Sequence, residues 1–133
     1  MSNLINFRGR GDHRGHLTVL EEGTEIPFSV KRIYYLTATI EGVSRGFHAH
    51  KMLEQVAVCV AGSCEMVLDD GLKRETILLD SSDVGVYIGN LIWREMHNFS
   101  KDCVLLVLAS CEYDENDYIR LYEKFLEEVK SAI

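Results

Sequence analysis

The sequence predicts an all-β fold, a small barrel or jelly roll that ends in one α-helix. About nine short segments rich in β-branched and aromatic residues follow one another, with turn signals roughly every eight to twelve residues. Pro27 is the only proline, as expected for a chain of uninterrupted strands. After Asp114 the apolar residues change from alternation to helical spacing. We therefore expect one domain, residues 1–133, with its helix at the C-terminal end.

Composition narrows the function classes before any motif is considered. The chain has 133 residues, and 47% of them are hydrophobic and spread along its length, so a folded core is expected. A net charge of −7 argues against a nucleic-acid surface. The N-terminal segment lacks the apolar region of a signal peptide, and no apolar run approaches the ~18 residues of a transmembrane helix. We expect a soluble, cytoplasmic protein that binds neither nucleic acid nor a membrane.

The cysteines are predicted to be reduced. They show no C-x-x-C spacing and lie mostly within apolar runs, at Cys59, Cys64, Cys103 and Cys111. Buried free thiols are the expectation.

The first half of the chain combines a polar arm with three strands. Residues 1–16 are rich in arginine and glycine, which indicates an N-terminal arm that can bring cations to a site. The longest strand places Arg32, Tyr34 and Leu36 on one face, because side chains alternate along a strand. The expected strands are 17–22, 30–40 and 45–50.

The second half contains the clearest hairpin and the predicted helix. Asp69-Asp70-Gly71 favours a tight turn between two strands. Apolar residues from Tyr118 to Val129 recur at helical spacing and predict a helix over 114–131, with Asp114 as its N-cap. The expected strands are 54–61, 63–68, 72–79, 86–88, 91–99 and 103–110.

Two histidines stand at the centre of the functional interpretation. His48 and His50 are separated by one residue, so an extended strand puts both imidazoles on one face and Ala49 on the other. Gly46 permits a bulge just before them. The pair could be structural, could bind a metal, or could carry out acid–base chemistry.

The spacing of these residues resembles the first motif of the cupin superfamily, a double-stranded β-helix jelly roll. The motif is Gly42-x5-His48-x-His50-x3-Glu54-x7-Gly62. In metal-binding cupins the two histidines and the glutamate are ligands, and here His97 is the one candidate for a fourth. The second cupin region, 85–93, lacks the usual proline and glycine, so we expect no metal and interpret Glu54 as a hydrogen-bond acceptor.

A closer resemblance runs over nearly the whole chain. It is to the sugar 3,4-ketoisomerases that act on dTDP-4-keto-6-deoxyglucose. The motifs that carry it include Arg14-Gly15, Ile26-Pro27-Phe28, Arg45-Gly46-Phe47-His48-Ala49-His50-Lys51, Glu95-Met96-His97, Tyr113-Asp114-Glu115 and Asp117-Tyr118-Ile119-Arg120. The resemblance implies a metal-free cupin without a cofactor, typically a homodimer. Such enzymes supply 3-keto sugars to aminotransferases that make amino-deoxysugars for surface glycans such as lipopolysaccharide or S-layer glycans.

The implied chemistry agrees with the residues. Moving a ketone from C4 to C3 requires one general base and one general acid and passes through an enediol or enediolate. From the resemblance, His48 is the base and His50 its partner in proton transfer or oxyanion stabilisation. Tyr34 is expected to donate a hydrogen bond in the same pocket.

The diphosphate of the substrate requires cations. Arg45 is the first candidate, provided that a bulge at Gly46 turns it toward the histidines, because guanidinium binds phosphate bidentately. Gln55 is expected to supply a polar contact. Trp93 has two open interpretations, a stacking contact with the substrate and a residue of the core. The further candidate cations are Arg32, Arg14 and Lys51.

The resemblance also predicts assembly and stereochemistry. N-terminal strands are expected to pair with, or cross to, the partner's sheet in a homodimer. Arg14-Gly15 matches the branch of the family that forms the galacto product, dTDP-3-keto-6-deoxygalactose. Two alternatives remain open: a metal-dependent, dioxygenase-like cupin, and a non-catalytic cupin that binds a sugar nucleotide.

Overall fold

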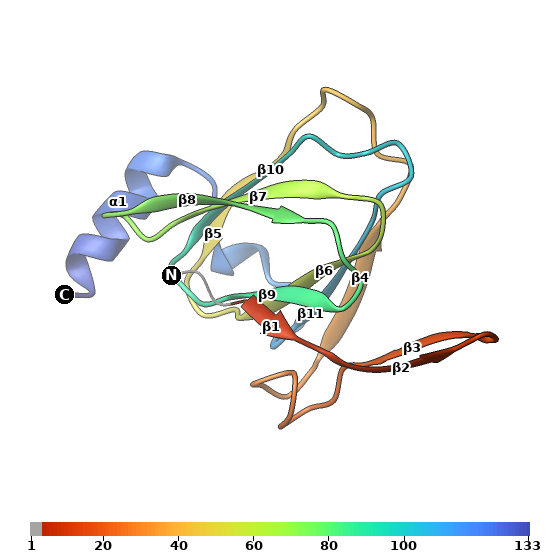
Figure 1. Cartoon of the computed structure of the whole chain (residues 1–133). Coiled ribbons are helices and arrows are strands. Elements are labelled where there is room, and N and C mark those ends of the chain that lie inside the picture. The colour runs from red at the N-terminus through yellow and green to blue at the C-terminus, as the bar shows by residue number, and fades with distance from the viewer. Residues whose placement is uncertain (1–3) are drawn as a thin grey trace.

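A computed structural model describes residues 4–133 and contains two five-stranded antiparallel sheets that face each other (Figure 1). The first sheet contains, in spatial order, β1 (Leu4–Asn6), β9 (Val84–Ile88), β6 (Gln55–Ala61), β11 (Val104–Ala109) and β4 (Arg32–Leu36). The second contains β12 (Tyr118–Ile119), β5 (Arg45–His50), β10 (Trp93–His97), β7 (Cys64–Asp69) and β8 (Arg74–Leu79). The predicted all-β jelly roll is confirmed.

The main core lies between the two sheets, where alternate residues of each strand face inward. The inward residues of β6 include Ala57 and Cys59, whereas Val56 and Val58 belong to a second cluster on the outer face of the first sheet. Both faces of this strand are therefore buried, as its nearly continuous apolar sequence predicts.

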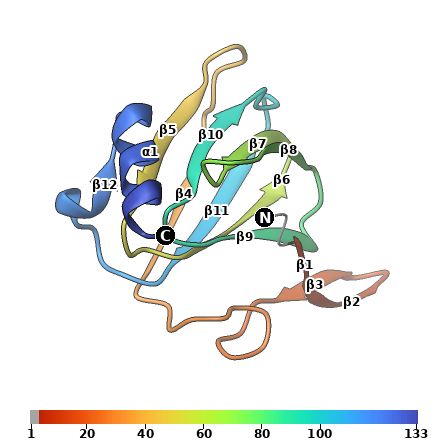
Figure 2. The same ribbon diagram turned by 90° about the vertical axis from the view of Figure 1, so that its left-hand side faces the viewer.

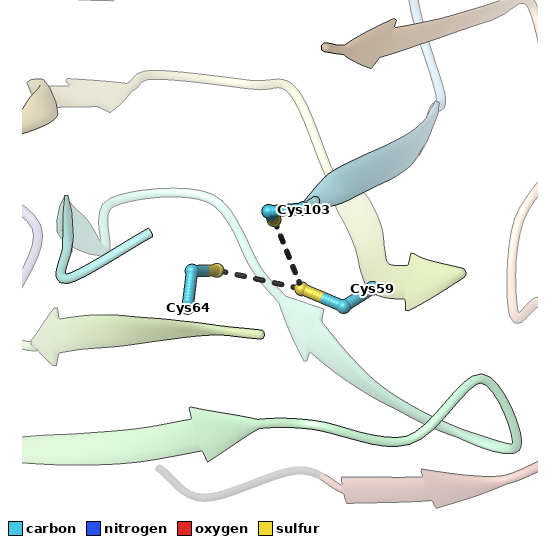
Figure 3. Close-up of side chains that lie close together, drawn as sticks. All are labelled: Cys59, Cys64 and Cys103. Atoms are coloured by element: carbon cyan, nitrogen blue, oxygen red, sulfur yellow. Dashed lines mark hydrogen bonds between the residues drawn. The ribbon is translucent and has the colours of Figure 1, made fainter. Parts of the chain in front are cut away.

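Three of the cysteines meet in this core (Figure 3). The Cys59 sulfur lies 3.6 Å from that of Cys64 and 3.7 Å from that of Cys103. Burial raises the pKa of the Cys103 thiol to about 12, so this group stays protonated. The prediction of buried free thiols holds for these three, whereas Cys111 is exposed.

The helix α1 (Tyr122–Ser131) covers the outer face of the second sheet (Figure 2). Its Phe125 is fully buried against Ala49, Trp93 and Ile119. Ala49 thus points away from the interior that receives its histidine neighbours, as strand alternation requires.

The predicted helix over 114–131 is wrong in its first half. Residues Glu115–Asp117 form a short 3-10 turn, and Tyr118–Ile119 form β12 before the helix begins at Tyr122. β12 pairs with His50 and Ala49 of β5, so sheet hydrogen bonds replace the helical ones that the apolar spacing favoured. The Asp114 side chain caps the 3-10 turn by accepting from the backbone N–H of Asn116 at 3.0 Å.

The N-terminal arm contains a hairpin that was not predicted. The hairpin β2 (Arg8–Asp12) and β3 (Gly15–Val19) projects from the barrel on the side away from α1 (Figures 1 and 2). The strand predicted over 17–22 corresponds to β3, which begins earlier, at Gly15. The first three residues of the predicted arm lie outside the residues that the structure describes. The predicted strand 30–40 is shorter too, since β4 covers only residues 32–36 and the backbone turns left-handed at Ala38.

No helix within residues 4–133 combines the length and apolar character that crossing a membrane requires.

Candidate active site

A bulge in β5 brings Arg45 and the histidines to the same side of the sheet. The pairing of β5 with β10 shifts register next to Phe47, where Gly46 and Phe47 both adopt positive φ, +94° and +55°. A Cβ on Gly46 would lie 3.3 Å from the carbonyl oxygen of Arg94, so both backbone conformation and close approach favour glycine. The bulge that Gly46 permits is therefore present, and it meets the condition on which Arg45 was expected to face the histidines.

The bulge opens a cavity of about 360 Å³ between β4, β5 and β10. This volume lies within the range of small-molecule sites. The side chains that line it come from both sheets and from the segment after β12: Arg32, Tyr34, Leu36, Arg45, His48, Met96, Tyr118 and Arg120. We call this space the histidine cavity. His50 lines a smaller neighbouring hollow of about 110 Å³ that shares Arg32 and Tyr118 with it.

The two imidazoles stand edge to face in contact with each other. Their ring centroids are 4.9 Å apart at 89°, and the Tyr118 ring packs against both at 5.0 and 4.4 Å. His48 Nδ1 lies 3.1 Å from the carbonyl oxygen of Gly46, and His50 Nδ1 lies 3.2 Å from a carboxylate oxygen of Asp117. Nε2 of His50 is buried and has no hydrogen-bond partner within the described chain.

Both histidines are neutral at neutral pH. Burial, reinforced by the positive charge of Arg94, lowers the pKa of His48 to about 4 and that of His50 to about 2. A neutral imidazole has one N–H, and a carbonyl oxygen can only accept, so His48 must carry its proton on Nδ1. Its bare Nε2 is then a proton acceptor.

A buried hydrogen-bond chain orients Tyr34. Nη1 of Arg94 donates to the Gln55 side-chain oxygen, and Gln55 Nε2 donates to the Tyr34 hydroxyl oxygen at 2.9 Å. Guanidinium has only donors, so the orientation of the Gln55 amide is determined. The Tyr34 oxygen therefore accepts from Gln55, which leaves its own O–H free to donate elsewhere.

The cavity is cationic although the protein is acidic. Arg32, Arg45 and Arg120 line it, and the fully buried Arg94 lies behind it. Arg120 is paired with Glu115 at 2.8 Å, whereas Arg32 and Arg45 form no ion pair with any carboxylate of residues 4–133. Burial lowers the pKa of Arg94 only to about 10, so this guanidinium stays charged. Unpaired guanidinium groups of this kind attract an anionic ligand.

The four donors of a metal-dependent cupin do not converge. Glu54 accepts the hydroxyl proton of Tyr87, and His97 is held between Ser44 and Glu95. In the part of the chain that the structure describes, the one group of three potential ligands whose donor atoms lie close together is the core cysteines. The alternative of a metal site built from His48, His50, Glu54 and His97 is therefore not supported by the geometry.

Comparison with known proteins agrees with this arrangement. The family model described as "FdtA: WxcM-like, C-terminal" matches residues 1–130. A curated relative, the TDP-4-oxo-6-deoxy-α-D-glucose-3,4-oxoisomerase of Aneurinibacillus thermoaerophilus, is 55% identical over 124 residues, which cover 93% of this chain and 89% of the relative. The chain belongs to this sugar 3,4-ketoisomerase family. Members of the family are intramolecular oxidoreductases.

Two solved structures of ketoisomerases superimpose closely. A mutant enzyme from Thermoanaerobacterium thermosaccharolyticum in complex with TDP-4-keto-6-deoxyglucose is 45% identical, with a TM-score of 0.94, and the match covers 98% of this chain and 94% of that one. The TDP-quinovose 3,4-ketoisomerase of Campylobacter jejuni is 48% identical, with a TM-score of 0.91, and the match covers 95% of this chain and 97% of that one.

Most of the predicted site residues meet at the histidine cavity or directly behind it. Tyr34, Arg32 and Arg45 line it with His48, and Gln55 lies behind Tyr34. Tyr35, the neighbour of Tyr34, points outward and is exposed.

Trp93 is a correction to the predicted site. It lies under α1 against Phe125, and its indole N–H donates to Glu95 at 2.9 Å. Strand alternation puts Arg94, and not Trp93, on the interior face of β10. A stacking role in the histidine cavity is therefore excluded for this side chain.

Three other predicted contacts lie outside the cavity. Lys51 is exposed beside α1 and lines a surface hollow with Lys124 and Glu128. Arg14 and Gly15 lie on the projecting hairpin, where the Arg14 guanidinium pairs with Asp12 at 2.6 Å. Within one chain, none of the three reaches His48.

Sequence reasoning missed four residues of the site. Arg94 could have been found because strand alternation puts it on the face opposite Trp93. Asp117, Tyr118 and Arg120 were recognised as a motif, but they were assigned to a helix that would have turned Tyr118 away from Asp117 and Arg120. Their placement beside His50 follows from β12, which pairs with β5.

Proposed function

We propose that the protein moves the keto group of dTDP-4-keto-6-deoxy-D-glucose from C4 to C3 by histidine acid–base catalysis. The observation that carries this proposal is a pair of neutral, contacting histidines in a cationic cavity, next to a tyrosine whose hydroxyl proton is free to donate. The family relationship supports the substrate class. A 3-keto product is the substrate that an aminotransferase requires.

The reaction balances without an external oxidant. Nε2 of His48 removes the proton from C3, a C3–C4 double bond forms, and the carbonyl electrons move to O4. The Tyr34 hydroxyl stabilises the charge that develops on this oxygen. O3 then loses its proton as the C3 carbonyl forms, and O4 and C4 each take up one proton, so two protons leave the sugar and two return. His50 takes part as the second proton carrier, so the pair returns to its starting state.

Arginine side chains bind the diphosphate in this proposal. Arg45 and Arg32 face the cavity without a carboxylate partner among residues 4–133, which favours both for phosphate binding. Arg14 is available only from the hairpin. Its exposed pair with Asp12 contributes little and can be exchanged for a phosphate.

A homodimer would bring the hairpin to a second chain. β4 forms one edge of the first sheet and exposes Ile33 and Tyr35, and the hairpin exposes Leu17. We propose that N-terminal strands pair with, or cross to, the partner's sheet, which would cover this edge. Light scattering is expected to give a dimer mass at micromolar concentration, and a 15 kDa species would refute the assembly.

For the configuration at C4 we propose the galacto product, because Gly15 leaves space beside the sugar and Arg14 cannot itself supply a proton. The 48% identical Campylobacter jejuni enzyme is named for TDP-quinovose, a gluco-configured sugar, and so favours the opposite outcome. In a 3-keto sugar, H4 couples only to H5. A small H4–H5 coupling in the NMR spectrum of the product formed in ordinary water would support galacto, and a large diaxial coupling would establish gluco.

The deciding experiment is incubation of the purified protein with dTDP-4-keto-6-deoxyglucose in deuterium oxide, followed by NMR. The expected result is a 3-keto sugar that carries deuterium at C4. Binding without deuterium incorporation at either carbon would refute catalysis and favour the non-catalytic sugar-nucleotide cupin.

A further inference from the structure

We infer that Asp117 is a positioning residue that keeps the proton of neutral His50 on Nδ1 and so leaves its Nε2 bare as a proton acceptor. The consequence for catalysis rests on the proposed function. The placement of the proton does not, because it follows from hydrogen bonding in the free protein.

Asp117 is held rigidly from four directions. Its Oδ1 accepts from the backbone N–H of Met52 at 2.8 Å, and its Oδ2 accepts from that of Leu53 at 3.2 Å. Its own backbone N–H donates to Asp114 at 3.0 Å, and its carbonyl accepts from the backbone N–H of Lys51 at 2.9 Å. The side chain is 14% exposed, so the carboxylate has little freedom to turn away from His50.

These contacts determine the tautomer of His50. Two backbone N–H groups point at the carboxylate, so both of its oxygens act as acceptors. His50 Nδ1, 3.2 Å from Oδ2, must then be the donor. The ring of a neutral histidine has no second proton, and the unpartnered, buried Nε2 is left as a base.

The partner of His50 differs from that of His48 in charge. Gly46 offers His48 a neutral carbonyl, whereas Asp117 offers His50 a carboxylate. The other charges that act on His50 are positive: Arg94 from β10, Arg32 from β4 and Arg120 beyond β12, all of which lower its pKa. Asp117 is therefore the contact that stabilises the imidazolium formed when His50 receives a proton during turnover.

The test is Asp117→Asn. Either orientation of the new amide places its N–H₂ against a backbone N–H. The orientation that keeps the 2.8 Å bond from Met52 presents N–H₂ to His50, which must then accept at Nδ1 and carry its proton on Nε2. By analogy with an aspartate-to-asparagine change beside a catalytic histidine, we expect kcat to fall by about 100- to 10,000-fold, with KM nearly unchanged.

The direct readout is the tautomer itself. Long-range proton–nitrogen correlation spectra of labelled protein distinguish protonated from bare ring nitrogens, and the spectrum of His50→Asn assigns the signals among the five histidines. We expect Nδ1–H for His50 in the wild type and Nε2–H in Asp117→Asn. A loss of stability alone would not exchange the two nitrogens.

Asp114→Asn is the matched control. The substitution removes the same charge from the same 3-10 turn, and Asp114 lines the same small hollow as Asp117. Asparagine caps a turn as well as aspartate does, so the turn should be kept. We expect wild-type kcat and an unchanged His50 tautomer.

The outcomes separate this inference from the proposed function. If the wild type does not isomerise the sugar nucleotide, the proposed function fails, while the spectra still decide the tautomer. If Asp117→Asn does not fold, the wild-type spectrum decides alone. Nε2–H or a doubly protonated ring in the wild type at neutral pH, or wild-type kcat in a folded Asp117→Asn, would overturn the inference.

Discussion

The histidine cavity and the β2–β3 hairpin were both assigned to the active site on the basis of sequence, yet the structure treats them differently. In the cavity, Tyr34 comes from one sheet of the barrel and Arg45 and His48 come from the other, and all three line one space. On the hairpin, the one polar side chain among residues 4–133 that Arg14 contacts is Asp12 of its own turn. Two residues of β3 attach the hairpin to the barrel at Asp83: Thr18 donates to its carboxylate at 2.6 Å, and His16 lies 3.0 Å from the same oxygen.

The difference shows which parts of the site one chain can build. Strand pairing within each sheet and packing between the two sheets hold the acid–base residues at fixed spacing. The hairpin has few contacts with its own barrel, so its proposed part in binding depends on a second copy. Variants in the two regions should therefore differ both in the size of their effect and in the kinetic parameter that changes.

The largest effect is expected from His48→Asn. Removing the general base should lower kcat by about 1,000-fold or more, with the fold and much of the nucleotide affinity retained. The measurement is single-turnover NMR of the sugar, with circular dichroism as the test of folding. His50→Asn should be strongly impaired as well, and the double variant should be little worse than either, because the pair acts as a unit. Full activity of His48→Asn would show that His48 is not the general base.

A smaller loss is expected from Tyr34→Phe. Deleting one donor to a developing oxyanion costs about 100- to 1,000-fold, so kcat should fall by roughly 100-fold. Tyr35→Phe is the matched control, since it lies next in the chain and points outward, and it should keep wild-type kcat. Equal activity of the two variants would contradict the proposed role of the Arg94–Gln55–Tyr34 chain.

The hairpin variant should act on binding and not on chemistry. A lost hydrogen bond to a charged group is worth about 1.5–3 kcal/mol, so Arg14→Ala should raise KM by about 10-fold or somewhat more, with kcat nearly unchanged. Arg10→Ala removes the same charge from the paired strand of the same hairpin and should have little effect. An unchanged KM in Arg14→Ala would show that the hairpin does not reach a bound nucleotide.

The smallest effect concerns the dependence of stability on pH. Below pH ~6.5 the unfolded histidines take up protons, while the folded ones do not until about pH 4 for His48 and about pH 2 for His50. The unfolded state then binds more protons, so the free energy of unfolding should fall as the pH drops from about 6.5 to 4. Urea unfolding between pH 7.5 and 4.5 measures this slope.

The same measurement separates the two regions. The hairpin is attached through Asp83, and the hydrogen bonds from Thr18 and His16 lower the pKa of this carboxyl group. The contribution of Asp83 to the free energy of unfolding is therefore lost only when the pH falls below the ordinary range of carboxyl pKa values. His48→Asn should therefore flatten the slope above pH 4.5, whereas Asp83→Asn should not. An identical slope in wild type and His48→Asn would mean that the cavity histidine titrates near its ordinary pKa.

Sequence alone was sufficient wherever strand alternation or local turn chemistry decides the outcome. His48 and His50 share a face and Ala49 takes the other, because alternation along a strand does not depend on what the strand packs against. The hairpin at Asp69-Asp70-Gly71 and the buried thiols were predicted for similar local reasons. The bulge at Gly46 was anticipated because Arg45 otherwise faces away.

The tertiary structure decided what local patterns leave ambiguous. Both faces of β10 are buried, one under α1 and one in the barrel, so apolar content alone could not say whether Trp93 or Arg94 faces the histidines. The spacing from residue 114 fits a helix, but a helix there would leave the edge of β5 without backbone partners. Tyr118 and Ile119 pair with His50 and Ala49, which satisfies the backbone groups at this edge. The same pairing places Asp117 next to Nδ1 of His50.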